Sequence, residues 1–372
     1  MTGLYVHVPF CTKKCHYCNF VIALAAPVEN HSIFLESLEQ EARHRERDLS
    51  GVVFDTVYVG GGTPSVLEAR EFEWLVRILR THFKIQAEAE FTCEANPGDV
   101  DLKKALLLKK LGINRISLGA QSFHDDTLQK LNRTHRAAEI DSSFRYLRDA
   151  GFNNINLDLI LSLPGEPWGR ARYSLERLAA LDPEHVSLYE LTVEDKTVFG
   201  ERQRQRTLHL PDEDEQFENL SNARVFLKGQ GYRHYELLSY AKRGRESRHN
   251  LLYWANEDTI GLGPGAYSYH KGTRSRFSDS YQQYLTKIRA GDWVPVEEET
   301  LAGDKREVES FLLALRLTDG ASIERFTPVT ARLGEEIRDL TEKGLLEQDE
   351  TGIRLTARGQ FLAETVFAEL SC

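Results

Sequence analysis

Cysteine is scarce in this sequence of 372 residues: there are five, an odd number. Small secreted scaffolds that depend on disulfides carry many cysteines, usually in even numbers. Three of the five lie together between positions 11 and 18. This distribution argues against a disulfide framework and indicates a metal site instead.

Long apolar runs are also missing. No run approaches the roughly 20 residues that a membrane span needs. The first residues lack the charged and then apolar pattern of a signal peptide. We therefore expect a cytoplasmic protein without a transmembrane segment.

An excess of positive charge is the third absence. The 47 Lys and Arg residues stand against 57 Asp and Glu residues, for a formal net charge of -10. Such a chain has no global attraction for nucleic acid or anionic lipid, so we expect no nucleic-acid partner. Hydrophobic residues make up 41% and charged residues 28%, as in ordinary globular proteins. The length predicts one large domain with one or two small ones.

The clustered cysteines have the spacing Cys11-x3-Cys15-x2-Cys18. Soft thiolate ligands favour zinc, copper(I) or an iron–sulfur cluster. Structural zinc takes four protein ligands, and no fourth ligand stands at the expected spacing except His16, which is poorly placed to fold back. Three thiolates on a four-iron cluster would leave one iron open to a small molecule. A set of reduced thiols without function is the remaining alternative.

This motif resembles the signature of the radical S-adenosylmethionine (SAM) superfamily. The family pattern is C-x3-C-x2-C with an aromatic residue before the last cysteine, here Tyr17, and it follows a first β-strand, here Leu4–Val8. The resemblance implies a [4Fe–4S] cluster held by Cys11, Cys15 and Cys18. It also implies that the open iron is chelated by the amino and carboxylate groups of S-adenosylmethionine.

A succession of βα units provides a check on this resemblance. Short β-rich runs alternate with helical stretches such as Arg136–Ala150, at spacings of roughly 25 to 50 residues. Such alternation predicts an α/β fold with a parallel sheet, here a partial (β/α)6 barrel of the radical SAM type. The six predicted strands are Leu4–Val8, Thr56–Val59, Ala89–Cys93, Arg115–Leu118, Ile155–Leu159 and Val186–Leu188.

Polar and glycine residues follow these strands, at the sheet edge where ligands gather. Each could singly be a turn, a helix cap or a surface ion pair. Together they resemble one branch of the superfamily, the oxygen-independent coproporphyrinogen oxidase-like proteins, over nearly the whole chain. The resemblance implies that the following residues hold the nucleoside and methionine parts of S-adenosylmethionine: Tyr5, Gly61, Gly62, Thr63, Glu94, Gln121, Arg133 and Asp158.

The second half carries further blocks of this branch, at residues 231–241, 248–254 and 261–269. We expect a barrel over residues 1–220, a family-specific extension over 221–303, and a small helical and winged domain over 304–372. In the last domain we predict helices over Val308–Leu317 and near Glu335–Lys343. A hairpin of Leu345–Glu347 and Ile353–Leu355 should follow.

A winged domain suggests DNA binding, but residues 321–372 carry six Lys and Arg against ten Asp and Glu. This acidic balance is a poor match for phosphate. The domain is therefore expected to cap the barrel or to dock a protein.

Two functions compete within this branch. The first is a coproporphyrinogen III dehydrogenase, which converts coproporphyrinogen III to protoporphyrinogen IX by radical chemistry. The second is a haem chaperone of the HemW type, which binds haem and passes it to acceptor proteins. The dehydrogenases typically have a fourth cysteine two residues after the triad and a segment before the first strand. Here that position is Phe20, and three residues precede Leu4. Both differences favour the chaperone.

The block His249-Asn250-Leu251-Leu252-Tyr253-Trp254 matches the HNxxYW motif that the resemblance associates with haem binding. Imidazole is a common axial ligand of haem iron, and aromatic rings offer flat apolar surfaces to a macrocycle. The alternative is that His249 and Asn250 cap a helix while the aromatic rings fill the barrel mouth.

We therefore expect a haem chaperone that carries a [4Fe–4S] cluster, S-adenosylmethionine and haem, and no catalytic residue is assigned. Its expected partners are haem-acceptor proteins and an electron donor such as a flavodoxin or ferredoxin. A radical enzyme with another substrate, or an iron–sulfur protein without S-adenosylmethionine, are further possibilities. Cys93 is predicted to be a buried packing residue and Cys372 to lie in a disordered end.

Overall fold

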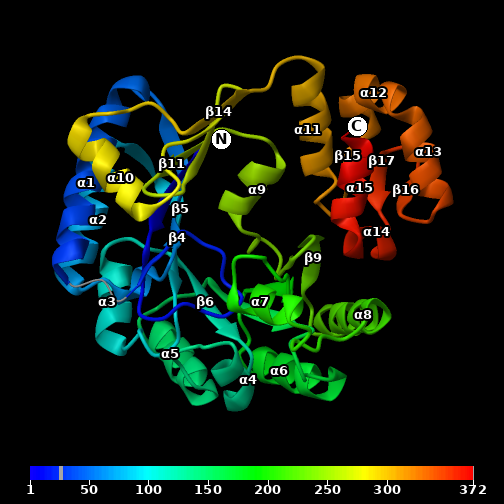
Figure 1. Cartoon of the computed structure of the whole chain (residues 1–372), viewed down its shortest axis with the longest axis horizontal. Coiled ribbons are helices and arrows are strands. Elements are labelled where there is room, and N and C mark those ends of the chain that lie inside the picture. The colour runs from blue at the N-terminus through cyan, green and yellow to red at the C-terminus, as the bar shows by residue number, and fades with distance from the viewer. Residues whose placement is uncertain (25–27, 372) are drawn as a thin grey trace.

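The computed structural model describes residues 1–24 and 28–371 (Figure 1). A curved sheet forms its centre, and six strands that follow one another in the chain are neighbours and parallel in it. All six predicted strands are confirmed, several with extra residues at their ends. They are β1 (Gly3–Val8), β4 (Val53–Gly61), β5 (Lys84–Ala95), β6 (Arg115–Gln121), β7 (Ile155–Leu161) and β8 (His185–Glu190).

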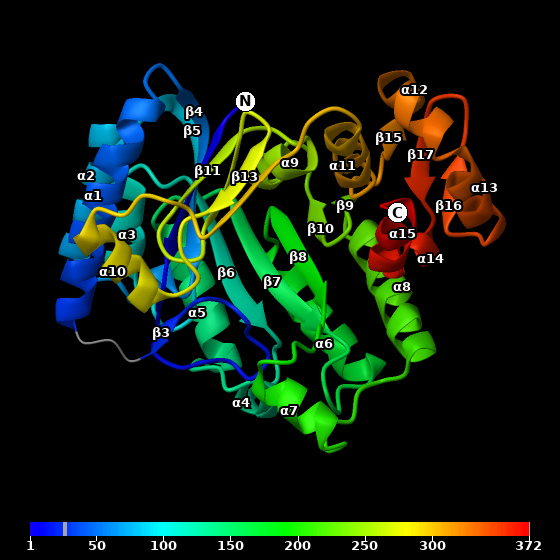
Figure 2. The same ribbon diagram turned by 45° about the horizontal axis from the view of Figure 1, so that its top comes forward.

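Helices between these strands cover the outer face of the sheet, and the main hydrophobic core lies between helices and sheet (Figure 2). In α2, buried Phe72, Leu75 and Leu79 recur at helical spacing and therefore share one face. The predicted helix 136–150 is confirmed as α5. The covering helices are α1 (Val28–Asp48), α2 (Ala69–His82), α3 (Leu102–Lys110), α5 (Ala137–Asp149) and α6 (Trp168–Leu181), with the short α4 (Asp125–Lys130) and the 3-10 turn η1 (Pro64–Val66) beside them.

The chain beyond β8 extends the sheet at both edges. On the β8 side it adds the antiparallel strands β10 (Ser239–Ala241) and β9 (Arg233–Glu236), and on the β1 side it adds the parallel strand β11 (Thr259–Leu262). The antiparallel strands β12 (Tyr267–His270), β13 (Thr273–Arg276) and β14 (Glu297–Thr300) follow β11. The helices of this region are α7 (Val198–Arg204), α8 (Glu213–Gly229), α9 (Arg248–Trp254) and α10 (Tyr281–Ala290), and a small pair, β2 (Phe10–Cys11) and β3 (Ala23–Leu24), precedes α1.

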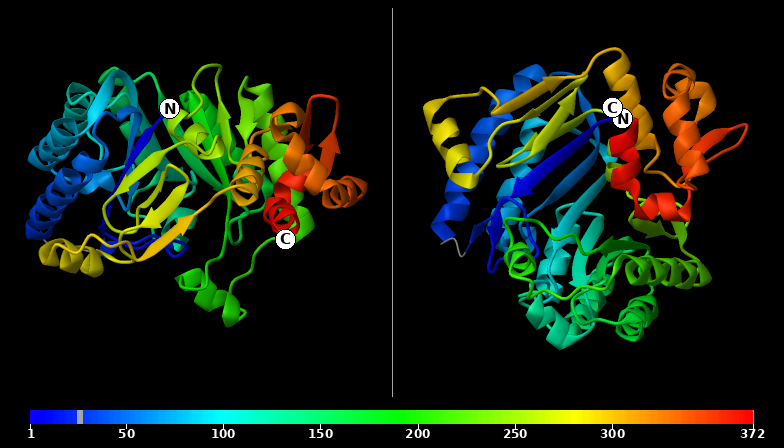
Figure 3. Two further views of the ribbon diagram at one scale, coloured as in Figure 1. Left: turned by 90° about the horizontal axis from the view of Figure 1, so that it is seen from above. Right: turned by 45° about the vertical axis from the view of Figure 1, so that its right-hand side comes forward.

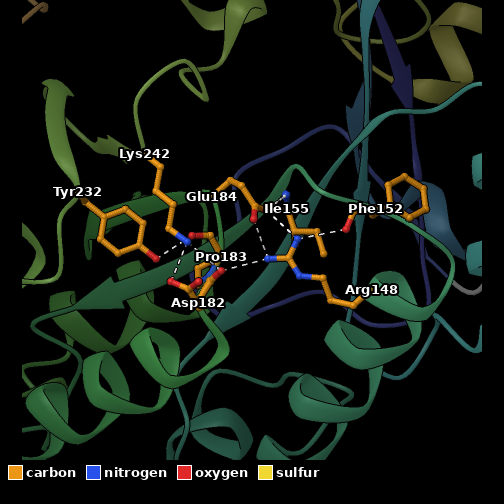
Figure 4. A network of polar contacts seen from close by, with 8 residues as sticks. All are labelled: Arg148, Phe152, Ile155, Asp182, Pro183, Glu184, Tyr232 and Lys242. Carbon is orange, nitrogen blue, oxygen red and sulfur yellow. Dashed lines mark hydrogen bonds and ion pairs between the residues drawn. The ribbon is translucent and has the colours of Figure 1, made fainter.

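An ion-pair network ties α5 to the amino-terminal ends of β7 and β8 (Figure 4). Arg148 donates two hydrogen bonds to the Glu184 carboxylate, of 2.8 and 2.9 Å, and further ones to the carbonyl oxygens of Phe152 and Asp182. Glu184 also accepts from the backbone N–H of Ile155. This edge of the sheet is therefore fixed by charge-assisted hydrogen bonds.

The chain from α11 onward builds a second hydrophobic core beside the first part (Figure 3). The predicted first helix is found, but it begins and ends earlier than expected. The second predicted helix and the hairpin are confirmed. The elements are α11 (Asp304–Ala314), β15 (Ala321–Ser322), α12 (Ile323–Arg332), α13 (Gly334–Glu342), β16 (Leu346–Gln348), β17 (Gly352–Leu355), α14 (Ala357–Phe361) and α15 (Ala363–Leu370). Among residues 1–24 and 28–371, no helix is long and apolar enough to span a membrane.

Candidate functional site

A cavity of about 440 Å³ opens at the carboxyl ends of the barrel strands. Its walls combine a loop between β2 and β3 with residues that end β4, β5, β6 and β7. The structure brings together in this cavity ten of the fourteen residues that the sequence singled out, while Tyr5, His249, Tyr253 and Trp254 do not line it. The ten are Cys11, Cys15, Cys18, Gly61, Gly62, Thr63, Glu94, Gln121, Arg133 and Asp158.

The cysteine loop is held by backbone contacts with neighbouring loops. The N–H of Cys18 donates to the carbonyl oxygen of Cys15 at 3.1 Å, which forms a turn between the last two cysteines. The ring nitrogen Nδ1 of His16 lies 2.8 Å from the carbonyl oxygen of Lys130, and the His16 backbone bonds to Leu131 and Phe199. His16 therefore serves to anchor the loop, which disfavours it as a fourth metal ligand.

Two side chains contact the cysteine sulfurs directly. The hydroxyl of Thr63 lies 3.3 Å from Sγ of Cys11, and Nη1 of Arg133 donates to Sγ of Cys15 at 3.4 Å. Burial raises the pKa of the Cys11 thiol to about 11 and also raises that of Cys18. Desolvation disfavours a bare thiolate here, so the thiolates need a bound cation.

Asn96 links the two side chains that contact the sulfurs. Its Nδ2 donates to the Thr63 hydroxyl at 3.3 Å, and its Oδ1 accepts from Nη2 of Arg133. Nη2 of Arg133 also donates to the carbonyl oxygen of Gly119 at 2.9 Å. The guanidinium is thus fixed at the cavity wall, where it can bind a carboxylate. The sequence did not single out Asn96, although it lies two residues after Glu94.

The glycines after β4 leave no room for side chains. Gly61 has φ of +107°, and a Cβ there would lie 2.7 Å from the ring of His7. A Cβ on Gly62 would lie 2.7 Å from the carbonyl oxygen of Phe10, next to the first cysteine. The close packing of this turn against the cysteine strand explains both glycines better than a plain tight turn does.

Two half-buried carboxylates also line the cavity. Oε1 of Glu94 accepts from the Tyr58 hydroxyl at 2.9 Å, and Oε2 accepts from the Gly61 N–H at 3.1 Å. Burial raises the pKa of Glu94 to about 7, and the charge of Asp158 adds to the rise. Oδ1 of Asp158 accepts from Asn156 at 2.7 Å. These acceptors suit hydroxyl and ammonium donors of a ligand.

Comparison with known proteins assigns this architecture to a family. A family model described as the radical SAM superfamily matches residues 5–178, and a second, the HemN C-terminal domain, matches residues 303–362. The protein named heme chaperone HemW of Bacillus subtilis (strain 168) is 35% identical over 99% of this chain and 98% of its own. This chain belongs to the radical SAM superfamily and to the same family as this relative. The protein of the same name from Lactococcus lactis subsp. lactis (strain IL1403) is 36% identical over 98% of this chain and 95% of its own.

The solved structure of coproporphyrinogen III oxidase (HemN) from Escherichia coli shows the same radical SAM fold. It superposes with a TM-score of 0.86 over 100% of this chain and 90% of that one, at 24% sequence identity. At this identity the superposition establishes the partial barrel and the small C-terminal domain. It leaves the activity open.

The radical SAM superfamily implies a [4Fe–4S] cluster and S-adenosylmethionine. Within the described part of the chain, no three His, Cys, Asp or Glu side chains converge on a point where one metal ion could bind. A four-iron cube presents its irons at separate corners, so its thiolates need to surround a volume and not a point. The three cysteines around one cavity fit the cluster better than they fit a single zinc ion.

The HNxxYW block forms α9, which lies outside this cavity. His249 is 1% exposed, with Nδ1 2.7 Å from the Thr56 hydroxyl and Nε2 3.1 Å from the Tyr253 hydroxyl. Both ring nitrogens therefore have protein partners. Ser247, and not His249, caps the helix, because its hydroxyl accepts from the N–H of Asn250.

Tyr253 and Trp254 line a second, smaller cavity of about 250 Å³ with Tyr267 and Tyr269. Tyr5 lines neither of these two cavities. Its hydroxyl is 3.1 Å from Nδ1 of His7, and the charge of Glu94 and the nearby Tyr253 add to the burial that raises its pKa. The buried packing role predicted for Cys93 is confirmed, because its side chain is fully buried in β5. Cys372 lies outside the described residues.

Proposed function

We propose that this protein is a haem chaperone, which binds haem and passes it to acceptor haem proteins. Similarity over nearly the full length to proteins named heme chaperone HemW is the observation that carries the proposal. The position two residues after the cysteine triad supports it. Phe20 stands there, 63% exposed, so the chain offers no fourth thiolate at this point of the loop.

We further propose that Cys11, Cys15 and Cys18 hold the [4Fe–4S] cluster and that the same cavity holds S-adenosylmethionine. When bound, the cluster supplies an electron and an open iron for the methionine end of the cofactor. The guanidinium of Arg133 would bind the cofactor carboxylate. Glu94 and Asp158 would accept hydrogen bonds from its ammonium and ribose hydroxyl groups.

The backbone turn at Gly61 and Gly62 would let the ligand approach closely, with Thr63 at its end. The Oε1 atom of Gln121 is buried without a hydrogen-bond partner, so this side chain would accept from a cofactor N–H or O–H. The reductant would be a small electron-transfer protein such as a flavodoxin or ferredoxin. The cytoplasmic location expected from the sequence stays a prediction.

Haem binding at the HNxxYW block would require α9 to move. The cavity beside Tyr253 and Trp254, of about 250 Å³, falls below the roughly 300 Å³ at which ligand pockets begin. Both nitrogens of His249 are also bonded. We therefore propose two positions of α9: a seated one, which the structure describes, and a released one, in which the aromatic rings and His249 reach haem.

The test is a direct comparison of the two ligands on anaerobically reconstituted protein with S-adenosylmethionine and reductant. Haem binding in stoichiometric amount and transfer to an apo-haem protein, with no protoporphyrinogen formed, is the expected result. Conversion of coproporphyrinogen III to protoporphyrinogen IX would make the protein a dehydrogenase and would overturn the proposal. Absorption spectra and product analysis distinguish these outcomes.

The cluster site is tested in the same preparation. Replacing Cys11, Cys15 and Cys18 together by serine should abolish the cluster absorbance. Cys93→Ser is the matched control, because it removes a thiol from the strand next to the cavity without touching the loop. A cluster that persists in the triple variant would place the ligands elsewhere.

A further inference from the structure

A chain of buried hydrogen bonds runs through the barrel interior from the cofactor cavity to α9. Starting at the cavity, Asp158 bonds to Asn156 (2.7 Å), Asn156 to His185 (2.6 Å), and His185 to Tyr235 (2.8 Å). The Tyr235 hydroxyl accepts from the backbone N–H of Ser247 at 3.1 Å. The three side chains beyond Asp158 belong to the strands β7, β8 and β9, and Asn156 and His185 are fully buried.

In every hydrogen bond of this series, the donor lies on the α9 side and the acceptor on the Asp158 side. A carboxylate only accepts, so Asn156 uses its NH2 group for Asp158 and its Oδ1 for His185. Nδ1 of His185 must then carry the proton, and burial keeps the ring neutral by lowering its pKa. Nε2 is left as the acceptor for the Tyr235 O–H. Hydrogen bonds aligned in one direction polarise one another, and here the negative end is the charge in the cavity.

The hydrogen-bond series ends at the start of α9. Ser247 is the N-cap of that helix, and the Glu90 carboxylate accepts from the next two backbone N–H groups, those of Arg248 and His249. A second connection reaches the same helix from Glu94, because the Tyr58 hydroxyl donates to Glu94 while its ring lies 5.2 Å from the ring of His249. Two carboxylates of the cavity thus connect to one helix.

We propose that Asn156, His185 and Tyr235 are positioning residues that couple occupancy of the cavity at Asp158 to the seating of α9. The inference rests on the proposed function, since it takes S-adenosylmethionine as the ligand of Asp158 and haem as the ligand of the released helix. A cofactor whose hydroxyl groups donate to Asp158 keeps that carboxylate ionised and in place. The end of the series is thereby fixed, and with it the Tyr235 hydroxyl that accepts from Ser247, so that α9 is held in its seated position.

The coupling has a definite sign. S-adenosylmethionine favours the seated helix and haem favours the released one, so each ligand weakens the binding of the other. Linkage requires that the two effects be equal in magnitude. Coupling between sites typically changes affinity by about 5-fold or more, which sets the effect to look for.

The first experiment contains no haem. Hydrogen exchange of the backbone amides of residues 247–254 is measured by mass spectrometry on cluster-loaded protein, with and without saturating S-adenosylmethionine. We expect the cofactor to slow exchange at the start of α9 by about 5-fold or more. Unchanged exchange would overturn the coupling, whether or not the protein binds haem.

The second experiment uses a pair of tyrosine variants. Tyr235→Phe removes the hydroxyl that joins His185 to Ser247. Tyr232→Phe removes a buried hydroxyl that is not part of the hydrogen-bond series and donates to the Pro183 carbonyl oxygen at 2.7 Å (Figure 4). The slowing of exchange by the cofactor should disappear in Tyr235→Phe and persist in Tyr232→Phe. Equal loss in both variants would show a general structural effect and would contradict the proposal.

The third experiment measures the haem dissociation constant with and without S-adenosylmethionine. Wild type and Tyr232→Phe should bind haem about 5-fold or more weakly when the cofactor is present, and Tyr235→Phe should show a ratio near one. A wild-type ratio of one, with haem bound, would overturn the coupling and leave the chaperone function standing. Absence of haem binding would overturn the chaperone function, while the exchange experiment would still decide the coupling.

Discussion

Glu94 is the residue whose ionisation controls the acidic wall of the cavity. Partial burial of its carboxyl group raises its pKa to about 7, while the hydrogen bond from Tyr58 opposes the rise. In the unfolded chain this group would titrate near 4.5. Between these values the folded protein binds the extra proton, so Glu94 makes the protein less stable as pH rises through this window. A ligand that donates hydrogen bonds to the ionised Glu94 carboxylate offsets this loss of stability.

The pH dependence of cofactor binding follows from this position. Affinity for S-adenosylmethionine should rise with pH up to about 7, as Glu94 ionises, and then level off. Tyr58→Phe removes a hydrogen bond that favours the ionised form, which is equivalent to about one pKa unit. The midpoint should therefore move upward, with weaker binding at neutral pH. Titration of the dissociation constant against pH gives the midpoint.

The control for this prediction is another tyrosine whose hydroxyl donates to a carboxylate. Tyr284 on α10 donates to Oε2 of Glu41 on α1 at 2.8 Å, away from the cavity. Tyr284→Phe should leave the pH midpoint of cofactor binding where it is. A similar shift in both variants would mean that Glu94 does not set the midpoint.

The residues of the cavity were predictable from sequence to different degrees. The cysteines and the glycines lie in short motifs, Glu94 lies near the end of β5, and Asp158 lies within β7. Tyr58 and Asn96 were missed. Tyr58 lies inside a strand, and it meets Glu94, 36 positions away, only through the register of β4 on β5. One-dimensional spacing carries no signal for such a pair.

At the scale of elements, α9 differs from what its sequence suggested. A histidine that ligates haem iron needs a free nitrogen, yet the fold places His249 between Thr56 and Tyr253 with both nitrogens bonded. The helix lies at the barrel floor because β11, which follows it, pairs in parallel with β1. The short run Thr259–Leu262 was too brief to be recognised as a seventh parallel strand.

The network at the amino-terminal ends of β7 and β8 should contribute strongly to stability. Arg148→Met removes the guanidinium that pairs with Glu184, whose side chain is 15% exposed, and leaves that carboxylate largely buried without its charge partner. We expect a loss of about 2–3 kcal/mol, measured as a lower urea midpoint by circular dichroism. The cavity lies at the opposite end of these strands, so cofactor affinity should be unchanged.

A surface ion pair provides the control for Arg148. Arg172 pairs with Glu176 one turn along α6, and the two side chains are 61% and 48% exposed. Arg172→Met should cost less than about 0.5 kcal/mol, because exposed pairs of this kind contribute little. If both variants lose the same stability, the bidentate pair of Arg148 has no special role.

At the scale of the whole molecule, the two larger hydrophobic cores of the described residues lie side by side, and α9 lies where they meet. Arg316, beyond α11, stacks its guanidinium 4.5 Å from the ring of Trp254, and the backbone of Glu236 pairs with that of Leu317. We propose that residues 1–220, 221–303 and 304–372 are the three parts of the chain. The acidic last part would then cap the barrel floor beside α9, and not bind DNA.

Leu237, at the bend between β9 and β10, tests how independent the second core is. It connects two edge strands of the central sheet, yet its side chain is 7% exposed and packs in the second core. Leu237→Ala should destabilise the second core by about 2–4 kcal/mol through the cavity that it leaves. Limited proteolysis should then cut faster within residues 304–371, while cluster absorbance and cofactor affinity stay unchanged. Leu106→Ala, at a side chain 50% exposed on α3, should leave proteolysis unchanged. If Leu237→Ala instead lowers the stability of both cores by the same amount in one transition, the two cores form a single cooperative unit, and release of α9 would have to involve the whole protein.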